Sequence, residues 1–446
     1  MATAQVVPPP GEATGSRRRP APGVWWLSPA GAVLLIVPVT LGFATAYSPQ
    51  DFLTYFRTPK SLTSSTALLF AAGALVLVLG TFLTQVGQRG PARPGRWPWF
   101  SPAQLDTLER CSTVLFRVTV IGYLSFLVAA ARNGVSPGDV VSAVLAQDVS
   151  SGELESTIGT IPGITTLTQV GVAYGVVAAL VLTDRVDRRT ILRLAALTLM
   201  SLLRAYVFTE RLALIEVVVP ALVVLVVRAS HTRSSSRRFA LGLAPLPLVV
   251  LLVLGFAASE YSRSYQFFKT QTSDGLILFS AKRLSGYYAT AYNNGQIGLT
   301  YDNYPGRLPY TSLEAVWTAP LVEQADVYNR LVGRDSSEHY QALLRTYGNP
   351  EFNNPGGLPA PFIDFGRVGG LVVLLGMGLA VGVAYRAFLQ GKAVGVLIYP
   401  VVVTGLFELP RFLYWTLGRT VPTVLALLLV AGALNRCDRR APALRL

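Results

Sequence analysis

Long apolar runs alternate with short polar connections over most of the chain. Ten runs approach or exceed the roughly 20 residues that an α-helix needs to cross a bilayer. They cover residues 25–47, 65–86, 111–131, 164–182, 191–208, 212–227, 239–258, 368–385, 394–409 and 412–434. The pattern predicts an all-α polytopic membrane protein with about ten transmembrane helices. A composition of 51% hydrophobic and only 14% charged residues agrees with this class.

The remaining segments predict how the chain is divided. Residues 1–23 are rich in Pro, Ala, Gly and Arg without periodicity, which indicates a disordered tail. Residues 24–258 hold the first seven predicted helices, and residues 365–435 hold the last three. Residues 436–446 form a basic tail. Between the two groups of helices lies one long polar interruption, residues 259–364, which is predicted to be a large, partly helical loop domain.

The net charge of +14 comes largely from basic connections between the helices. Alternate connections carry the basic clusters, which the positive-inside rule assigns to the cytoplasm. These clusters include Arg17–Arg19, Arg89, Arg93 and Arg96, Arg185, Arg188 and Arg189, Arg237 and Arg238, and Arg439 and Arg440. Both termini are therefore predicted to be cytoplasmic and residues 259–364 extracytoplasmic. No nucleic-acid-binding motif accompanies the charge, so no nucleic-acid partner is predicted.

The polar stretch 259–364 has a distinctive composition. It contains 11 of the chain's 19 tyrosines, together with many arginines and amides. Aromatic rings stack on sugar faces and guanidinium groups bind phosphate oxygens, so this composition suits a ligand that is both hydroxylated and anionic. Helical spacing occurs at residues 276–291, 324–332 and 338–347. Residues 349–370, rich in Gly and Pro, are predicted to form a hinge that returns the chain to the membrane.

Charged residues within the apolar runs are the first functional candidates. Arg204 and Glu216 lie near the outer ends of the fifth and sixth runs, where an unpaired charge costs about 2–3 kcal/mol. One interpretation is an Arg204–Glu216 pair that only joins two helices. The alternative is that Arg204 and Arg211 line an anion-binding cavity open to the outside, with Glu210 as the nearest carboxylate.

Further basic candidates lie later in the chain. Arg411 and Arg419 are eight residues apart, which on a continuous helix places both on one face with Trp415. A snorkelling Arg411 with Glu408 as its partner is the simpler alternative. On the predicted loop helix, Arg283 lies one turn before Tyr287, with Tyr288 and Asn294 following. The alternative for Arg283 is a solvated basic face, and His339 has little support as a base.

Several kinds of chemistry lose support because their motifs are absent. The sequence contains no phosphate-binding GxxxxGK[ST], no GxGxxG, no HExxH and no GxSxG. Its two cysteines, Cys111 and Cys437, have no metal-ligand spacing. No metal and no cofactor are predicted. The energy for any reaction outside the cell must therefore come with an activated substrate.

The arrangement resembles a known family. Residues 353–370, NNPGGLPAPFIDFGRVGG, close the large loop before a glycine-rich helix, and residues 210–214, ERLAL, begin another helix. This arrangement and these short motifs are similar to those of the Wzy-type O-antigen polymerases, which polymerise oligosaccharide repeat units. The resemblance spans most of the membrane region.

The resemblance implies a metal-independent glycosyltransferase in a bacterial cytoplasmic membrane. Its substrate would be a polyprenyl-diphosphate-linked oligosaccharide, and its partners would include membrane lipids, a flippase and a chain-length regulator. The arginines would neutralise the diphosphate, a carboxylate would accept the acceptor's proton, and other loop residues would contact sugar. The implied diphosphate-binding residues are Arg204, Arg211, Arg283, Arg411 and Arg419. The implied general base is Glu210 first and Asp364 second. The implied sugar contacts are Tyr287, Tyr288 and Asn294.

Three other interpretations remain. An O-antigen-ligase-like enzyme would make a single transfer, but its outer-loop histidine has only His339 as a counterpart. A transporter or flippase of a lipid-linked or anionic solute would show internal repeats, which are not evident. A structural assembly protein leaves the deep Arg419 unexplained. If the diphosphate-binding hypothesis holds, alanine at Arg211, Arg283 or Arg419 abolishes polymer formation without changing the protein level in the membrane.

Overall fold

The structure, a computed structural model, describes most of the chain. The described residues are 24–86, 100–136, 138–139, 157–161, 163–208, 210, 212–231, 234–261, 265, 269–270, 273–302, 308–333 and 335–440. The predicted tail at residues 1–23 and the end of the basic tail, residues 441–446, lie outside them.

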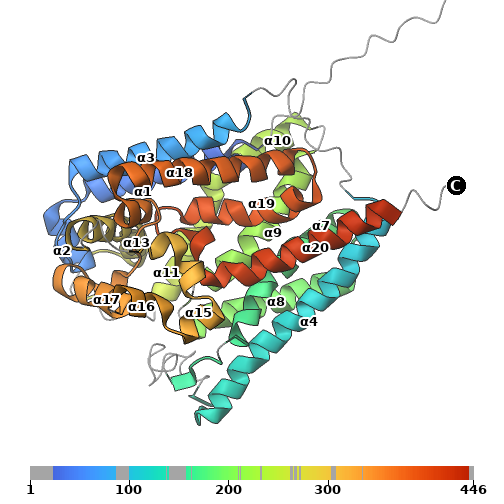
Figure 1. The fold of residues 1–446 in the computed structure, drawn as a ribbon, viewed down its shortest axis with the longest axis horizontal. Helices are drawn as coiled ribbons and strands as arrows, with labels where there is room; N and C mark the ends of the chain where they lie inside the picture. Colours follow the sequence, from blue (N-terminus) through green and yellow to red (C-terminus); the bar gives the residue numbers. More distant parts are fainter. Residues whose placement is uncertain are drawn as a thin grey trace, which may run out of the picture.

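Long helices run side by side along the molecule, and every regular element within the described ranges is helical (Figure 1). Among the described residues, seven segments are long and apolar enough to cross a membrane. They are Pro29–Ala46 (α1), Ser64–Leu83 (α3), Pro102–Arg132 (α4), Thr165–Asp184 (η2 and α7), Leu212–Ser230 (α9), Ala360–Leu389 (α18) and Gly418–Cys437 (η7 and most of α20). Length and composition thus support an all-helical, multi-pass membrane protein.

Three other predicted spans form helices that are shorter or more charged than these seven. Helix α8 (Arg188–Val207) contains four arginines. Helix α19 (Ala393–Glu408) has only 16 residues. The run at residues 239–258 divides into α10 (Ser235–Gly242) and α11 (Pro245–Glu260), because Pro245 begins a new helix and has no amide hydrogen to continue the previous one. Within the described ranges, seven helices have the length and composition of membrane spans, where the sequence pattern predicts about ten.

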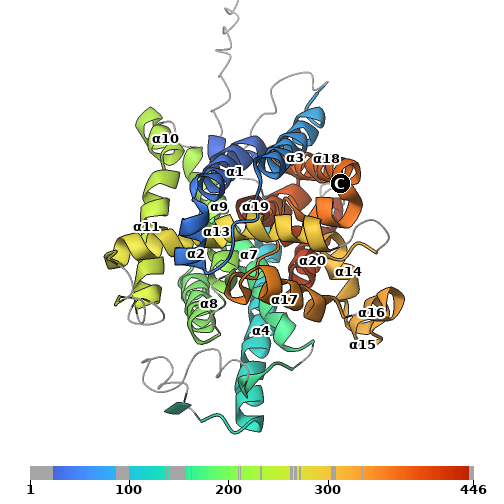
Figure 2. The same ribbon diagram turned by 90° about the vertical axis from the view of Figure 1, so that its left-hand side faces the viewer.

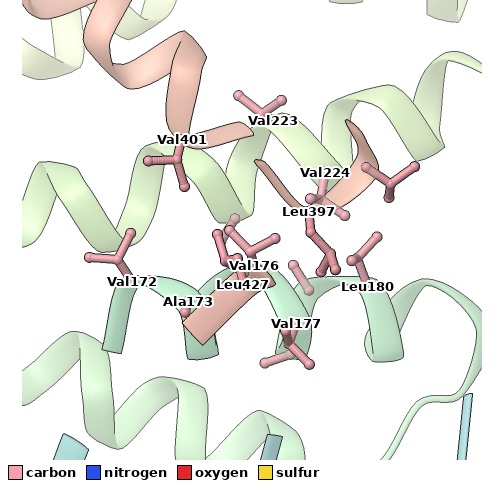
Figure 3. Packing of buried hydrophobic residues seen from close by; sticks show 14 of the residues in the cluster. Val172, Ala173, Val176, Val177, Leu180, Val223, Val224, Leu397, Val401 and Leu427 are labelled. Carbon is pink, nitrogen blue, oxygen red and sulfur yellow. The ribbon is translucent and has the colours of Figure 1, made fainter. Parts of the chain in front are cut away.

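Helix α7 (Val170–Asp184) lies at the centre of the bundle. Every residue from 170 to 181 is buried, because Val, Ala, Gly and Leu make the helix apolar on all sides. Figure 3 shows its valines packed beside Val223 of α9, Leu397 of α19 and Leu427 of α20. This dry core fixes the helices that carry the charged residues described below.

The elements of the polar stretch gather at one end of the bundle (Figure 1). Figure 2 looks onto that end and shows α13 (Leu276–Tyr301) lying across it. Asn293 of α13 accepts hydrogen bonds from the amides of Ser61 and Leu62 at 2.6 and 2.9 Å. The neighbouring Tyr292 stacks on Phe70 of α3 with ring centroids 6.0 Å apart. Helix α13 is therefore packed into the bundle.

The helical spacing within the stretch corresponds to real helices with shifted ends. The predicted 276–291 extends to Tyr301 in α13, and the predicted 338–347 is α17 (Ser336–Tyr347). Asp335 caps α17, since its carboxylate accepts the amide of Glu338 at 2.8 Å. The predicted 324–332 corresponds to α16 (Val327–Val332), preceded by α15 (Pro320–Gln324).

Shorter helices complete the described elements. They are η1 (Trp25–Leu27), α2 (Pro49–Phe56), η2 (Thr165–Gln169), η4 (Thr311–Leu313), α14 (Glu314–Trp317), η5 (Pro350–Phe352), η6 (Tyr414–Thr416) and η7 (Gly418–Thr420). Helix α20 then runs from Val421 to Arg440.

Helix α18 bends where the polar stretch re-enters the bundle. Gly366 has φ 72° and ψ −179°, a backbone conformation that residues other than glycine rarely adopt. It separates a short first part, which carries Asp364, from the long part that packs against α3. The bend lies within residues 349–370, the segment predicted to be a hinge.

The close contact between α18 and α3 depends on glycine. A Cβ atom at Gly378 would lie 2.1 Å from the carbonyl oxygen of Leu77, and one at Gly80 would lie 2.5 Å from that of Leu375. Small residues allow this approach between membrane helices. We expect Gly378→Leu to destabilise the protein by about 1–3 kcal/mol, measured by thermal unfolding in detergent. Gly376, which has open space beside it, is the control; equal effects at both glycines would contradict this packing.

The predicted continuous helix over residues 412–434 is wrong in its first part. Two short 3₁₀ turns, η6 and η7, precede α20, and Leu417 between them is extended (φ −70°, ψ 136°). The polar stretch contacts this segment, because the Thr416 hydroxyl donates to the carbonyl of Thr311 at 3.0 Å. Arg411 and Arg419 therefore do not share a helical face, and each has a different carboxylate partner.

Candidate functional site

A buried ion pair lies at the end of the bundle that carries the polar stretch. Glu216, in the second turn of α9, is only 1% exposed. Arg419 Nη2 lies 2.9 Å from its Oε2. With its nitrogen turned toward Glu216, the Gln169 amide donates to Glu216 at 3.3 Å and accepts from Arg419 at 3.1 Å. Thr423 fixes Gln169 by donating to its backbone carbonyl at 2.7 Å. A buried carboxylate requires such partners.

A second ion pair lies beside the first. Arg204 Nη2 is 2.5 Å from Glu210 Oε2, and its Nη1 donates to the Thr168 hydroxyl at 2.8 Å. The same Glu210 oxygen lies 4.0 Å from Arg419 Nη2, which joins the two pairs. Arg204 is thus paired with Glu210 and not with Glu216, the partner considered from the sequence. We call Arg204, Glu210, Glu216, Arg419 and Gln169 the charge network.

Five separate elements hold this network together. Gln169 ends η2, Arg204 is in the last turn of α8, and Glu216 is in α9. Arg419 is in η7, and Glu210 lies between α8 and α9. The members of the network lie up to 250 positions apart in the sequence, so only the folded bundle brings them together. Glu210 is the more accessible carboxylate, with 33% of its side chain exposed against 1% for Glu216.

Glu314 reaches the network from the polar stretch. Helix α14, which begins at Glu314, lies against η7. The nearby Gly418 amide and the Arg419 guanidinium both favour the charged form of the Glu314 carboxylate. Burial outweighs both effects and raises the pKa of Glu314 to about 7. The sequence did not predict this residue, because nothing local distinguishes Glu314 from the other carboxylates of the stretch.

Arg283 lies in a separate cluster. Its Nε is 3.2 Å from Glu260 of α11, which is 0% exposed, and its Nη2 forms a short ion pair with Glu351. The guanidinium also lies over the ring of Phe352, 5.4 Å from its centroid. Arg283 is 3% exposed, so the solvated basic face considered from the sequence is wrong. Two carboxylates already neutralise this predicted diphosphate-binding residue.

Arg411 forms a third cluster, over the inner side of α13. Its Nη1 lies 3.0 Å from Glu408 Oε2, the pair considered from the sequence. The guanidinium lies 6.0 Å from the centroid of the Tyr287 ring. Tyr287 packs on Phe352 with centroids 5.1 Å apart, and Tyr288 is also close to Glu408 and Arg411. The two predicted sugar contacts therefore border this cluster.

Asn294 and Asp364 bind the backbone of the polar stretch. Asn294 is 2% exposed and donates to the carbonyls of Phe352 and Asn354 at 2.6 and 3.0 Å. Asp364 accepts the amides of Tyr310 and Ser312 at 3.1 and 2.6 Å. These bonds anchor the stretch on α13 and α18. They occupy the groups that a sugar contact or a catalytic base would use.

Arg211 lies outside the described residues, so its predicted role stays a prediction. His339 bonds to Asp302 with 3.1 Å between Nε2 and Oδ1, in a cluster of its own. Within the described ranges, no group of three or more His, Cys, Asp and Glu residues is arranged to hold a metal ion. Of the predicted site residues, the structure brings together Arg204, Glu210 and Arg419, and adds Glu216, Gln169 and Glu314.

Fold and network together define a multi-pass helical membrane protein with a charged site at one end of its bundle. Comparison with protein-family models, with curated proteins and with solved structures found no match for this chain. The functional assignment therefore depends on the site itself.

Proposed function

We propose that this protein is a membrane glycosyltransferase that polymerises polyprenyl-diphosphate-linked oligosaccharide repeat units on the outer face of a bacterial cytoplasmic membrane. The observation that carries the proposal is the charge network beneath the polar stretch. Two arginines from distant parts of the chain, Arg204 and Arg419, meet around one partly exposed carboxylate, Glu210. That arrangement can accept an anion that bridges two guanidinium groups.

The diphosphate would take the position of Glu210. Arg204 and Arg419 carry two positive charges that Glu210 and Glu216 balance. Glu216 is buried and remains with Arg419, whereas Glu210 lies in a connection between helices and can move out. A diphosphate bound between the arginines is then neutralised as its charge grows during bond breakage. Arg211, next to Glu210, is the nearest further cation in the sequence.

The proposed reaction transfers a glycan between two lipid-linked units. A hydroxyl oxygen of the acceptor sugar attacks the anomeric carbon of the donor and forms the new glycosidic bond. The bond between that carbon and the diphosphate breaks, and the polyprenyl diphosphate leaves with the electron pair. The hydroxyl proton passes to a general base. Glu314 suits this role, because its pKa of about 7 leaves much of it ionised at neutral pH.

Replacing Glu314 by glutamine tests the base. In a reaction of purified protein with a synthetic polyprenyl-diphosphate oligosaccharide, we expect Glu314→Gln to lower the rate about 100-fold or more. The wild-type rate should rise with pH through about 7, because the base works only when deprotonated. The rate of the variant should lack this rise.

Glu323→Gln provides the matched control, since Glu323 is an exposed glutamate of the same polar stretch. It should keep both the wild-type rate and its pH dependence. If Glu314→Gln keeps the rise near pH 7, Glu314 is not the base, although the protein can still be a polymerase.

A further inference from the structure

A shallow apolar groove runs along an exposed face of α8, away from the charge network. It has a volume of about 490 Å³ and is lined mainly by Ile191, Leu194, Ala195, Thr198 and Leu202 of α8. The spacing of these residues puts them on one helical face. Arg204 is on the opposite side of the helix, turned toward Phe126 of α4.

The groove has the length of one lipid leaflet. Eleven residue steps separate Ile191 from Leu202, and at 1.5 Å per residue they span about 16 Å. Half of a hydrocarbon core about 30 Å thick is about 15 Å. A single acyl chain of the nearer leaflet would therefore lie along the groove from end to end.

A second, polar cleft continues the groove at the end of the bundle far from the polar stretch. This cleft, of about 410 Å³, is lined by Thr183, Leu225 and Ala229 and by two arginines, Arg228 and Arg237. Leu182 lines both hollows, so they adjoin. Arg228 donates from Nε to the Thr183 carbonyl at 3.4 Å, which holds it at the cleft. Arg237, on α10, is exposed.

We propose that this groove and cleft form a binding site for an anionic phospholipid. The acyl chain lies along α8, and the phosphate lies between Arg228 and Arg237. The charge at one end and the apolar wall of leaflet length match the two parts of such a lipid. Basic clefts between membrane helices bind anionic headgroups in this way, whereas a zwitterionic lipid gains less from two arginines. The site is independent of the proposed transferase reaction.

Native mass spectrometry of the full-length protein in detergent tests the site. Purified protein is titrated with phosphatidylglycerol or phosphatidylcholine, and the lipid that remains bound is counted. We expect the wild type to prefer phosphatidylglycerol on the order of tenfold. The double variant Arg228→Gln/Arg237→Gln should lose that preference. The matched control, Arg188→Gln/Arg189→Gln, removes two exposed arginines at the same end of the bundle and should keep it.

A third variant tests the groove without changing charge. In Ala195→Trp the larger side chain fills the groove along α8. This variant should no longer retain the lipid at this site while the protein stays folded. The proposal is overturned if the wild type retains both lipids equally, or if the two double variants behave alike. It is also overturned if Ala195→Trp retains phosphatidylglycerol as the wild type does.

Discussion

Replacing Arg419 by alanine is expected to destabilise the protein by about 3–5 kcal/mol, because the change leaves the carboxylate of Glu216 buried without its cation. Glu216 is 1% exposed, and Arg419 Nη2 lies 2.9 Å from it. The sequence alone predicts lost activity with an unchanged protein level. The structure changes that expectation, since Arg419 also has a structural partner. Thermal unfolding in detergent and the protein level in the membrane measure the effect.

A second substitution separates folding from function. The double variant Arg419→Ala/Glu216→Gln removes the cation and the buried charge together, so we expect it to recover most of the lost stability. It should still make no polymer, because Arg204 alone cannot bridge a diphosphate. Arg386→Ala, which removes an exposed arginine at the far end of α18, is the control for lost charge. A stable double variant with normal polymer would exclude Arg419 from diphosphate binding.

Arg283→Ala is expected to destabilise the protein by a similar amount, about 3–5 kcal/mol. Arg283 joins α13 to Glu260 of α11 and to Glu351 of the polar stretch. When Arg283 is removed, Glu260 remains 0% exposed but loses this cation, and α13 loses a link to both neighbouring segments. We therefore expect a low protein level in the membrane and a lowered unfolding temperature.

The neighbouring Lys282 is the matched control for Arg283. It pairs with Asp274 at 2.7 Å but is more exposed, so Lys282→Ala should cost only about 1 kcal/mol. An Arg283→Ala protein that is as stable as the wild type but inactive would contradict the structural role. That result would instead support the diphosphate contact first inferred for Arg283 from the sequence.

The helices were largely predictable because apolar runs are a strong local signal. Every predicted run contains a helix in the structure, and the predicted loop helices reappear with shifted ends. The failures arose from contacts between distant segments. Residues 412–420 have an apolar pattern, yet their backbone leaves the helix where Thr416 bonds to Thr311. Helical periodicity does not report such a contact.

The site was predictable only in part, for the same reason. Arg204 and Arg419 drew attention because charges in apolar runs are costly, and Glu210 because it is the carboxylate nearest to Arg204 and Arg211 in the sequence. Which carboxylate each arginine contacts depends on how α8, α9 and η7 pack. Glu314 could not be predicted as a site residue from the sequence, because its raised pKa results from burial in the folded protein. Asp364, in the motif 353–370, and Asn294, on the predicted loop helix, both suggested chemistry, yet both bind backbone groups.

The most direct test of the proposed function is product length. Purified wild-type protein is incubated with a synthetic polyprenyl-diphosphate oligosaccharide, and the glycans are separated by size beside the Arg419→Ala/Glu216→Gln variant. We expect the wild type to make a ladder of multiples of the repeat unit and the variant to make none. A single transferred unit would indicate a ligase-like enzyme. A folded wild-type protein that leaves the substrate unchanged would contradict the assignment as a polymerase.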